Sequence, residues 1–139
     1  MLSKLFLAWC VLGLCVLNHA YGVARAARWL RQRRISKDRV ASWTWISIGL
    51  AGFIIVLHLV EIAAWALLYG LLGAMPDLTS ATYFSAVTYT TTGYGDLVLP
   101  GEWRLVGAIE ALTGILMCGW STGFFFAVVS QMVDAGESR

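Results

Sequence analysis

The residues with the most distinctive chemistry form one short run, TTGYGD, at positions 91–96. Gly93 and Gly95 can adopt backbone conformations that a Cβ atom would strain. Such conformations let alternate backbone carbonyls face one axis, and a row of these oxygens can replace the water around a dehydrated K⁺ ion. A threonine hydroxyl would add an oxygen at the inner end. The residues expected to coordinate the ion are Thr91, Thr92, Gly93, Tyr94 and Gly95.

Two side chains of this run are expected to support the backbone. We call this row of carbonyl oxygens the filter. Tyr94 would point away from the ions and pack behind the filter as a spacer. Asp96 lies just outside the row of carbonyls, where its charge would hold the backbone and concentrate cations.

A coordinating backbone of this kind needs helices that hold it inside a bilayer. The chain has 139 residues and is 59% hydrophobic, well above the apolar share of ordinary soluble domains. Three apolar segments, at about residues 5–24, 45–72 and 105–133, are long enough to cross the hydrocarbon. These observations exclude a multidomain soluble protein and predict an all-α membrane protein.

Between the last two spans, residues 76–90 predict a short helix that enters the membrane and turns back. Pro76 ends the preceding span, and Asp77 or Thr79 can cap the new helix. The helix would reach about Thr90, which is too short to cross, so protein must bury it. Its carboxyl end would favour a cation through the helix dipole. Three of its aromatic residues are expected to pack around the filter: Tyr83, Phe84 and Tyr89.

The run at 91–96 resembles the selectivity signature of the potassium channel superfamily, specifically of small channels with one pore loop between two helices. Upstream, the sequence YFSAVTYT at 83–90 looks like that family's pore helix. Downstream, Pro100, Trp103, Arg104 and the sequence ALTGI at 111–115 are similar to the start and bend of its inner helix. The resemblance covers residues 44–132 and departs at Thr92, where the family more often has valine or isoleucine. The competing interpretation of the run is a chance glycine-rich turn.

The resemblance implies an outer helix, a re-entrant pore helix with a selectivity filter, and an inner helix, within a pore domain at residues 44–133. Residues 1–43 would add an N-terminal transmembrane helix and a basic cytoplasmic linker, and residues 134–139 a short cytoplasmic tail. One loop cannot enclose an ion, so four copies are needed and a homotetrameric pore follows. The implied function is passive, K⁺-selective conduction, although Thr92 leaves a less selective cation channel open.

The resemblance also suggests supporting residues. Val87 stands where some members carry an acid that pairs with the outer aspartate, so Asp96 needs another partner, for which we expect Tyr83 or Trp103. Gly114 lies near the family's bending glycine. It is either a hinge for gating or a small residue that packs on the pore helix.

Helical spacing after the bend places several residues on one face of the last span. Phe126 is expected near the narrow cytoplasmic end, where a bulky apolar ring can gate by dewetting. The residues expected to line the cavity are Ile115, Cys118 and Thr122.

Two acids lie inside predicted spans, where a charge costs roughly 2.5–3.5 kcal/mol at mid-span. Glu61 and Glu110 would both lie in the outer half behind the filter, and His58 is one helical turn from Glu61. We expect a buried cluster with pore-helix hydroxyls such as Ser85 or Thr88. Its protonation would bias the filter between conducting and inactivated forms. The alternative is static hydrogen bonding that only ties helices together.

The placement of positive charge predicts the orientation. Seven of the ten Lys and Arg residues lie between Arg25 and Arg39, which makes this loop cytoplasmic by the positive-inside tendency. The end of the filter at Asp96 would then face outside, and the C-terminus would be cytoplasmic. We expect the basic segment to form an interfacial helix beside anionic lipid. A voltage sensor is the less favoured alternative, because the segment is too polar and one helix cannot shelter it.

The first apolar segment allows three interpretations. Lys4 followed by an apolar stretch and a small-residue end is also typical of a cleaved signal peptide. Cleavage would move the basic loop outside and turn the filter toward the cytoplasm, so we favour an uncleaved span. A helix lying at the interface is the third possibility.

The remaining observations limit the function classes. No spacing typical of metal ligands, phosphate loops or nucleic-acid binding occurs, and His19 and His58 are isolated in the sequence. We expect no enzymatic chemistry, no organic cofactor and no nucleic-acid partner, only K⁺ ions in the filter. A K⁺ transporter subunit is one rival, although transporters resemble four linked repeats with degraded motifs. A non-conducting accessory subunit is another. Small size and the lack of targeting features point to a bacterial inner membrane.

Overall fold

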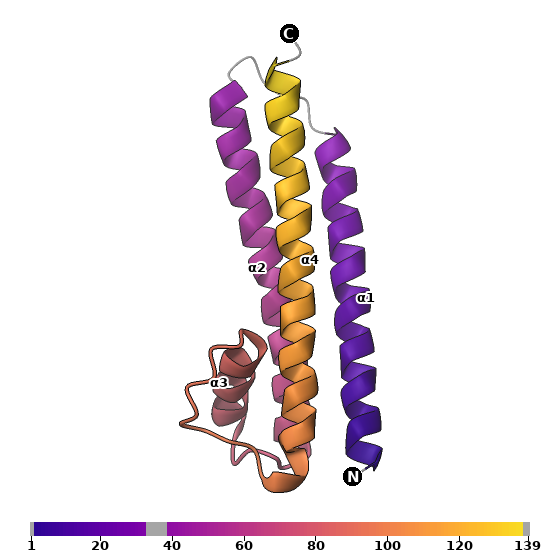
Figure 1. Ribbon diagram of the computed structural model, residues 1–139, viewed down its shortest axis with the longest axis vertical. Helices are drawn as coiled ribbons and strands as arrows, with labels where there is room; N and C mark the ends of the chain where they lie inside the picture. Colours follow the sequence, from indigo (N-terminus) through magenta and orange to yellow (C-terminus); the bar gives the residue numbers. More distant parts are fainter. Residues whose placement is uncertain (1, 33–38, 138–139) are drawn as a thin grey trace.

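The structure is a computed structural model that describes residues 2–32 and 39–137 (Figure 1). Its elements are α1 (Leu2–Gln32), α2 (Arg39–Leu71), α3 (Leu78–Tyr89), the 3₁₀ helix η1 (Gly101–Trp103) and α4 (Arg104–Glu137). Three of these regions, Leu2–Gln32, Val40–Leu71 and Gly101–Val133, are long and apolar enough to cross a membrane. The all-α membrane fold predicted from the sequence is confirmed.

The three long helices lie side by side, with α1 in contact with α4 and α2. The end of α1, the start of α2 and the C-terminal end of α4 lie together at the top of Figure 1. The short helix α3 lies near the opposite end, against α2 and α4. The basic end of α1 and the loop after α3 are therefore at opposite ends of the bundle.

The first helix is longer than predicted. We expected a span at about 5–24 followed by a separate surface helix over the basic segment, but α1 continues without a break to Gln32. The reason is local, because residues 23–32 contain neither Gly nor Pro and are rich in Ala and Arg, which are good helix formers. The prediction of a separate helix is wrong for 25–32, and residues 33–38 lie outside the described residues.

A polar contact fixes the first turn of α1 to η1, directly before α4. Lys4 Nζ lies 2.8 Å from a carboxylate oxygen of Glu102 and 4.4 Å from the centre of the Trp103 ring. The N-terminal helix is therefore attached at the same end of the bundle as the loop after α3.

The short helix α3 begins at the cap that the sequence predicted. Asp77 is the N-cap, and its carboxylate accepts hydrogen bonds from the backbone N–H and the hydroxyl of Ser80, both on the first turn. These bonds hold the pKa of Asp77 below its ordinary value. Of the two candidate caps, Asp77 and Thr79, the structure uses Asp77. With 12 residues, α3 is too short to span a bilayer.

An aromatic core fixes α3 against the long helices. The Tyr69 ring on α2 packs edge-on against Phe84 of α3 at 5.4 Å and against Trp103 of η1 at 6.3 Å. Trp65 stacks on Tyr69 one turn away. Burial of rings of this size is the main apolar contribution to the position of α3.

Candidate functional site

The backbone of residues 91–96 alternates in handedness. Thr91, Gly93 and Gly95 have positive φ angles of 58°, 54° and 77°, whereas Thr92 and Tyr94 between them do not. A backbone that alternates in this way turns successive carbonyls to the same side. The two glycines were expected to adopt these angles because they have no Cβ atom. The angle at Thr91 was not predicted, because threonine is β-branched and rarely adopts it.

The run starts directly from the end of α3. The amide of Thr91 donates to the carbonyl of Thr88 at 2.9 Å, and the amide of Gly93 donates to the carbonyl of Val87 at 3.0 Å. The hydroxyl of Thr90 donates to the carbonyl of Ala86, so the nearby hydroxyl of Thr92 donates to Thr90 at 2.9 Å. The inner half of the run is therefore bonded through its N–H and hydroxyl groups to the helix that precedes it.

The outer end of the run is held by Tyr83. The Tyr83 hydroxyl on α3 donates to a carboxylate oxygen of Asp96 at 2.7 Å. This bond lowers the pKa of Asp96 and raises that of Tyr83, so Asp96 carries its charge at neutral pH. Of the two partners proposed for Asp96, Tyr83 is confirmed. Trp103 is buried in the aromatic core, and the described residues show no bond between it and Asp96.

The side chains of residues 91–96 are exposed on this single chain, and Tyr94 is 71% exposed. The packing of Tyr94 behind the run is not made within the described part of this chain and stays a prediction. The residues proposed to line a cavity are also exposed on one face of α4: Ile115, Cys118, Thr122 and Phe126. Three of them, Cys118, Thr122 and Phe126, line a groove of about 600 Å³ between α4 and α2.

Gly114 marks the closest approach of α4 to the end of α3. A Cβ atom added at this position would collide with the carbonyl oxygen of Tyr89. The helix α4 continues unbroken on both sides of Gly114. This contact supports the packing interpretation of Gly114, and the hinge stays a prediction.

Glu110 forms one of two separate buried clusters. Its carboxyl group is bonded to the hydroxyls of Tyr69 on α2 and Ser85 on α3. The Ser85 hydroxyl also lies 2.9 Å from the carbonyl of Ile62, which can only accept. Because Ser85 has one proton to donate, both of its bonds form only if Glu110 is protonated. Glu110 is therefore a neutral acid that links three helices, and its predicted bond to Ser85 is confirmed.

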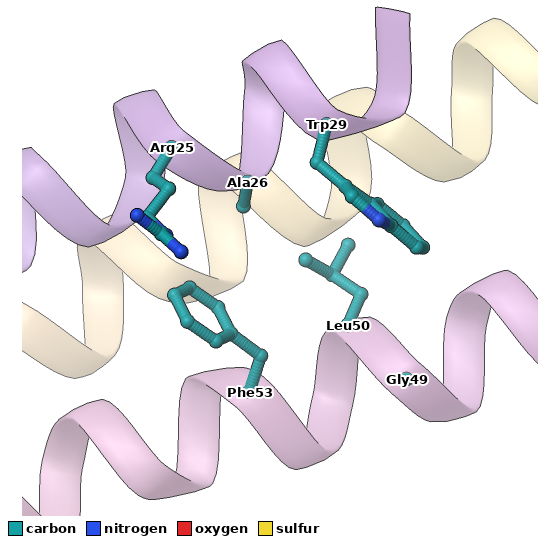
Figure 2. Close-up of a pocket in the computed structure, with 6 residues that line it drawn as sticks. All are labelled: Arg25, Ala26, Trp29, Gly49, Leu50 and Phe53. Atoms are coloured by element: carbon teal, nitrogen blue, oxygen red, sulfur yellow. The ribbon is translucent and has the colours of Figure 1, made fainter. Parts of the chain in front are cut away.

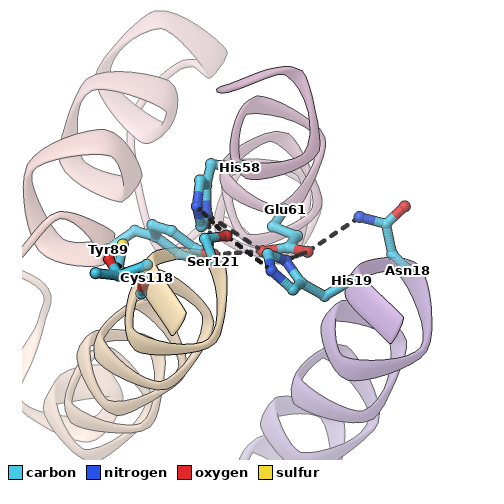
Figure 3. A network of polar contacts seen from close by, with 8 residues as sticks. Asn18, His19, His58, Glu61, Tyr89, Cys118 and Ser121 are labelled. Atoms are coloured by element: carbon cyan, nitrogen blue, oxygen red, sulfur yellow. Dashed lines mark hydrogen bonds and ion pairs between the residues drawn. The ribbon is translucent and has the colours of Figure 1, made fainter. Parts of the chain in front are cut away.

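Glu61 belongs to the second cluster, to which all four α-helices contribute (Figure 3). From α1, the Asn18 amide donates to Glu61 Oε1 at 3.0 Å, and His19 Nδ1 lies 3.1 Å from the same oxygen. The Tyr89 hydroxyl at the end of α3 bonds to Glu61 Oε2. His58 Nδ1 lies 3.0 Å from the Tyr89 hydroxyl and 3.7 Å from Glu61 Oε2.

One expectation about these clusters is wrong. Glu61 and Glu110 do not share one cluster, because Glu110 is bonded to Tyr69 and Ser85 instead. The pore-helix hydroxyl on Glu61 is that of Tyr89, which was expected to pack around the run. His19, which is isolated in the sequence, is fully buried against Glu61 in the fold. The sequence held one signal for it, because Asn18 and His19 are adjacent polar residues inside an apolar span.

One group in the described part of the chain has the residue types of a metal site. His19, His58 and Glu61 offer ligand atoms that all lie within 4.8 Å of one another. The nitrogens of both histidines and both oxygens of Glu61 are already in hydrogen bonds within the cluster. The arrangement is complete as a hydrogen-bonded network without an ion.

A second cavity lies between α1 and α2 near the basic end of the bundle (Figure 2). It has a volume of about 300 Å³, and Arg25 and Trp29 project into it from α1 toward Leu50 and Phe53 of α2. An apolar cavity bordered by one arginine suits an acyl chain with an anionic headgroup. The lipid contact at Arg25 stays a prediction, with this cavity as its place.

Comparison with known proteins adds one finding. A family model described as an ion channel matches residues 55–131, which is more than half of the chain and includes α3, residues 91–96 and most of α4. No curated protein and no solved structure matches the chain.

Proposed function

Since this chain belongs to the ion channel family, we propose that four copies of it form a pore that conducts K⁺ selectively and passively across a membrane. The observation that carries the proposal is the alternating backbone at 91–95, with positive φ at Thr91, Gly93 and Gly95, directly after a helix too short to span a bilayer. A backbone of this shape can present carbonyl oxygens as a substitute for the hydration shell of the ion.

The exposed surfaces of the single chain support a homotetramer. The run at 91–96 is exposed, and an irregular backbone facing lipid would leave polar groups without partners. Around a fourfold axis, the same run would face three copies of itself and enclose the ion. The exposed face of α4 that carries Ile115, Cys118 and Thr122 would then line the cavity, with Phe126 near its inner end.

Charge supports an orientation in which the basic end of the bundle is cytoplasmic. The end of α1, which carries Arg25, Arg28 and Arg31, and the C-terminal end of α4 lie at one end of the bundle, and the loop after α3 lies toward the other. Asp96, which is ionised, would then stand at the outer mouth and attract cations. The membrane we propose is a bacterial inner membrane.

The test is ion flux through the purified chain in liposomes. We expect K⁺ efflux that is much faster than Na⁺ efflux, needs no coupled H⁺ or Na⁺ gradient, and comes from a protein with the mass of four chains. Equal K⁺ and Na⁺ rates would instead indicate the less selective cation channel that the hydroxyl of Thr92 leaves open. Flux that stops without a coupling gradient would indicate a transporter subunit. A tetramer without flux would indicate an accessory subunit.

Replacing Tyr83 by phenylalanine is expected to change how flux depends on pH. The hydroxyl of Tyr83 keeps the pKa of Asp96 below its ordinary value, so its loss raises this pKa. As the pH falls, Asp96 would lose its charge at a higher pH in Tyr83→Phe, and K⁺ flux would begin to decline at that higher pH. Flux across an acidic pH series would measure the shift. Tyr21→Phe, at an exposed position on α1, is the control, and identical pH profiles for all three proteins would contradict the role of Asp96.

A further inference from the structure

The cluster around Glu61 contains a closed ring of five hydrogen bonds, and Asn18 donates to Glu61 Oε1 from outside the ring (Figure 3). Glu61 Oε1 faces His19 Nδ1 at 3.1 Å, and His19 Nε2 lies 2.9 Å from Ser121 Oγ on α4. Ser121 Oγ lies 3.1 Å from His58 Nε2, and His58 Nδ1 lies 3.0 Å from the Tyr89 hydroxyl. The bond from Tyr89 to Glu61 Oε2 closes the ring. Each of the four α-helices contributes at least one member.

The ring needs one proton for each bond, which makes five. Two neutral imidazoles, one serine and one tyrosine supply four protons, and an ionised glutamate supplies none. With Tyr89 donating to Glu61 Oε2, the fifth proton lies between Glu61 Oε1 and His19 Nδ1, on one atom or the other. With it, every bond is made and the ring as a whole carries no net charge.

The single proton of Ser121 fixes how the two imidazoles differ. Because its oxygen lies between two Nε2 atoms, it accepts a proton from one histidine and donates its own to the other. With Tyr89 donating to Glu61, His58 carries its proton on Nδ1, and His19 donates from Nε2. In the reverse order, the fifth proton lies on Glu61 Oε2 and is donated to Tyr89. The two histidines then exchange their tautomers, and the count of five protons is unchanged. In both orders, only one of the two Nε2 atoms is protonated.

The surroundings of the ring favour a neutral arrangement. His19, Glu61, Tyr89 and Ser121 are almost completely buried in a bundle built to cross a membrane, whereas the His58 side chain is 16% exposed and borders the groove between α2 and α4. Gain or loss of one proton would leave an unpaired charge and an unmade bond, both of which are costly there. The other titratable groups near the ring from the packed helices are the thiols of Cys15 and Cys118 and the second cluster of Glu110 and Tyr69. None of these thiols or neutral acids supplies a compensating charge.

We propose that this charge-neutral ring is a clamp by which the N-terminal helix positions the end of α3, and with it the first residue of the filter. Tyr89 is two residues before Thr91, and its carbonyl lies against Gly114, so a shift of its ring moves the filter. His19 and Ser121 act as positioning residues through Glu61 and Tyr89. The effect on conduction rests on the proposed function, whereas the ring itself does not. The proposed clamp also makes α1, which lies outside the matched region 55–131, part of the pore unit.

Nitrogen-15 NMR of the tetramer in bilayers tests the ring directly, because the chain has only two histidines, His19 and His58. We expect only one of the two Nε2 atoms to carry a proton. Protons on both Nε2 atoms, or on neither, would overturn the proposal. So would one zinc ion per chain in the purified protein, since a metal would use the same atoms.

Substitutions at Glu61 distinguish an effect of the hydrogen-bonded ring on flux from an effect of side-chain packing alone. A glutamine amide supplies the fifth proton from its NH₂ group and accepts the remaining bond with its oxygen, so Glu61→Gln is expected to keep both the histidine pattern and K⁺ flux within about twofold. Glu61→Leu and His19→Leu break the ring and are expected to lower flux by about tenfold or more. An equal loss of K⁺ flux in Glu61→Gln and Glu61→Leu would overturn the proton count. If the wild-type tetramer conducts nothing, the proposed function fails, while the NMR pattern still decides the ring.

Discussion

Alanine at Gly93 or Gly95 is expected to abolish K⁺ flux. Both residues have positive φ, and the space around each Cβ position is open on the single chain, so the expected effect is conformational and not a collision within one chain. A left-handed conformation costs a residue with a side chain roughly 1–2 kcal/mol, and the pore would contain four such residues. To relieve this strain, the backbone would leave the left-handed region and turn carbonyls away from the axis. Flux of both variants in liposomes is the measurement.

The matched control for this result is Gly13→Ala. Gly13 is a helical glycine with no positive φ and with nothing within 4 Å of its Cβ position, so alanine is expected to leave flux unchanged. Thr91 shows that the run already contains one strained residue with a side chain. Full K⁺ flux in Gly93→Ala tetramers would mean that conduction does not need the alternating backbone.

The features that could be predicted from the sequence are those set by local chemistry. Hydropathy indicated three spans, and the Asp77 cap and the glycine angles at Gly93 and Gly95 depend only on neighbouring residues. Tyr83 was one of two partners for Asp96 that the resemblance suggested, because Val87 stands where some family members carry an acid. For the spans, the cap and the glycine angles, residue type and position along the chain were sufficient.

The features that could not be predicted depend on how each helix is rotated about its axis. Helices that are apolar all round give little information about which face is buried. His19 on α1 therefore gave no indication that it faces Glu61, and nothing local distinguished the bond of Glu61 to Tyr89 from one to Thr88. Trp103 was misplaced for the same reason, because its contacts with Tyr69 and Lys4 come from helices distant in sequence.

Gly114→Ala is expected to destabilise the tetramer and to remove K⁺ flux with it. The added methyl group would collide with the carbonyl oxygen of Tyr89, which belongs to backbone and cannot move aside by rotating a side chain. Overpacking of this kind costs roughly 1–3 kcal/mol or more in each chain. Relief of this overpacking would push α4 away from the end of α3. The contact involves Tyr89, whose hydroxyl also closes the ring on Glu61. Thermal dissociation of the tetramer and flux in liposomes are the two measurements.

The same helix provides a control that separates this explanation from a hinge. Gly119 has nothing within 4 Å of its Cβ position, and alanine is favoured over glycine inside a helix by about 1 kcal/mol, so Gly119→Ala is expected to be at least as stable as the wild type. A hinge at Gly114 predicts a different pattern, in which Gly114→Ala tetramers are as stable as the wild type but open less often. Because the collision involves the carbonyl of Tyr89, two residues before Thr91, loss of stability and loss of flux should occur together. Normal stability with reduced opening would show instead that Gly114 serves as the hinge.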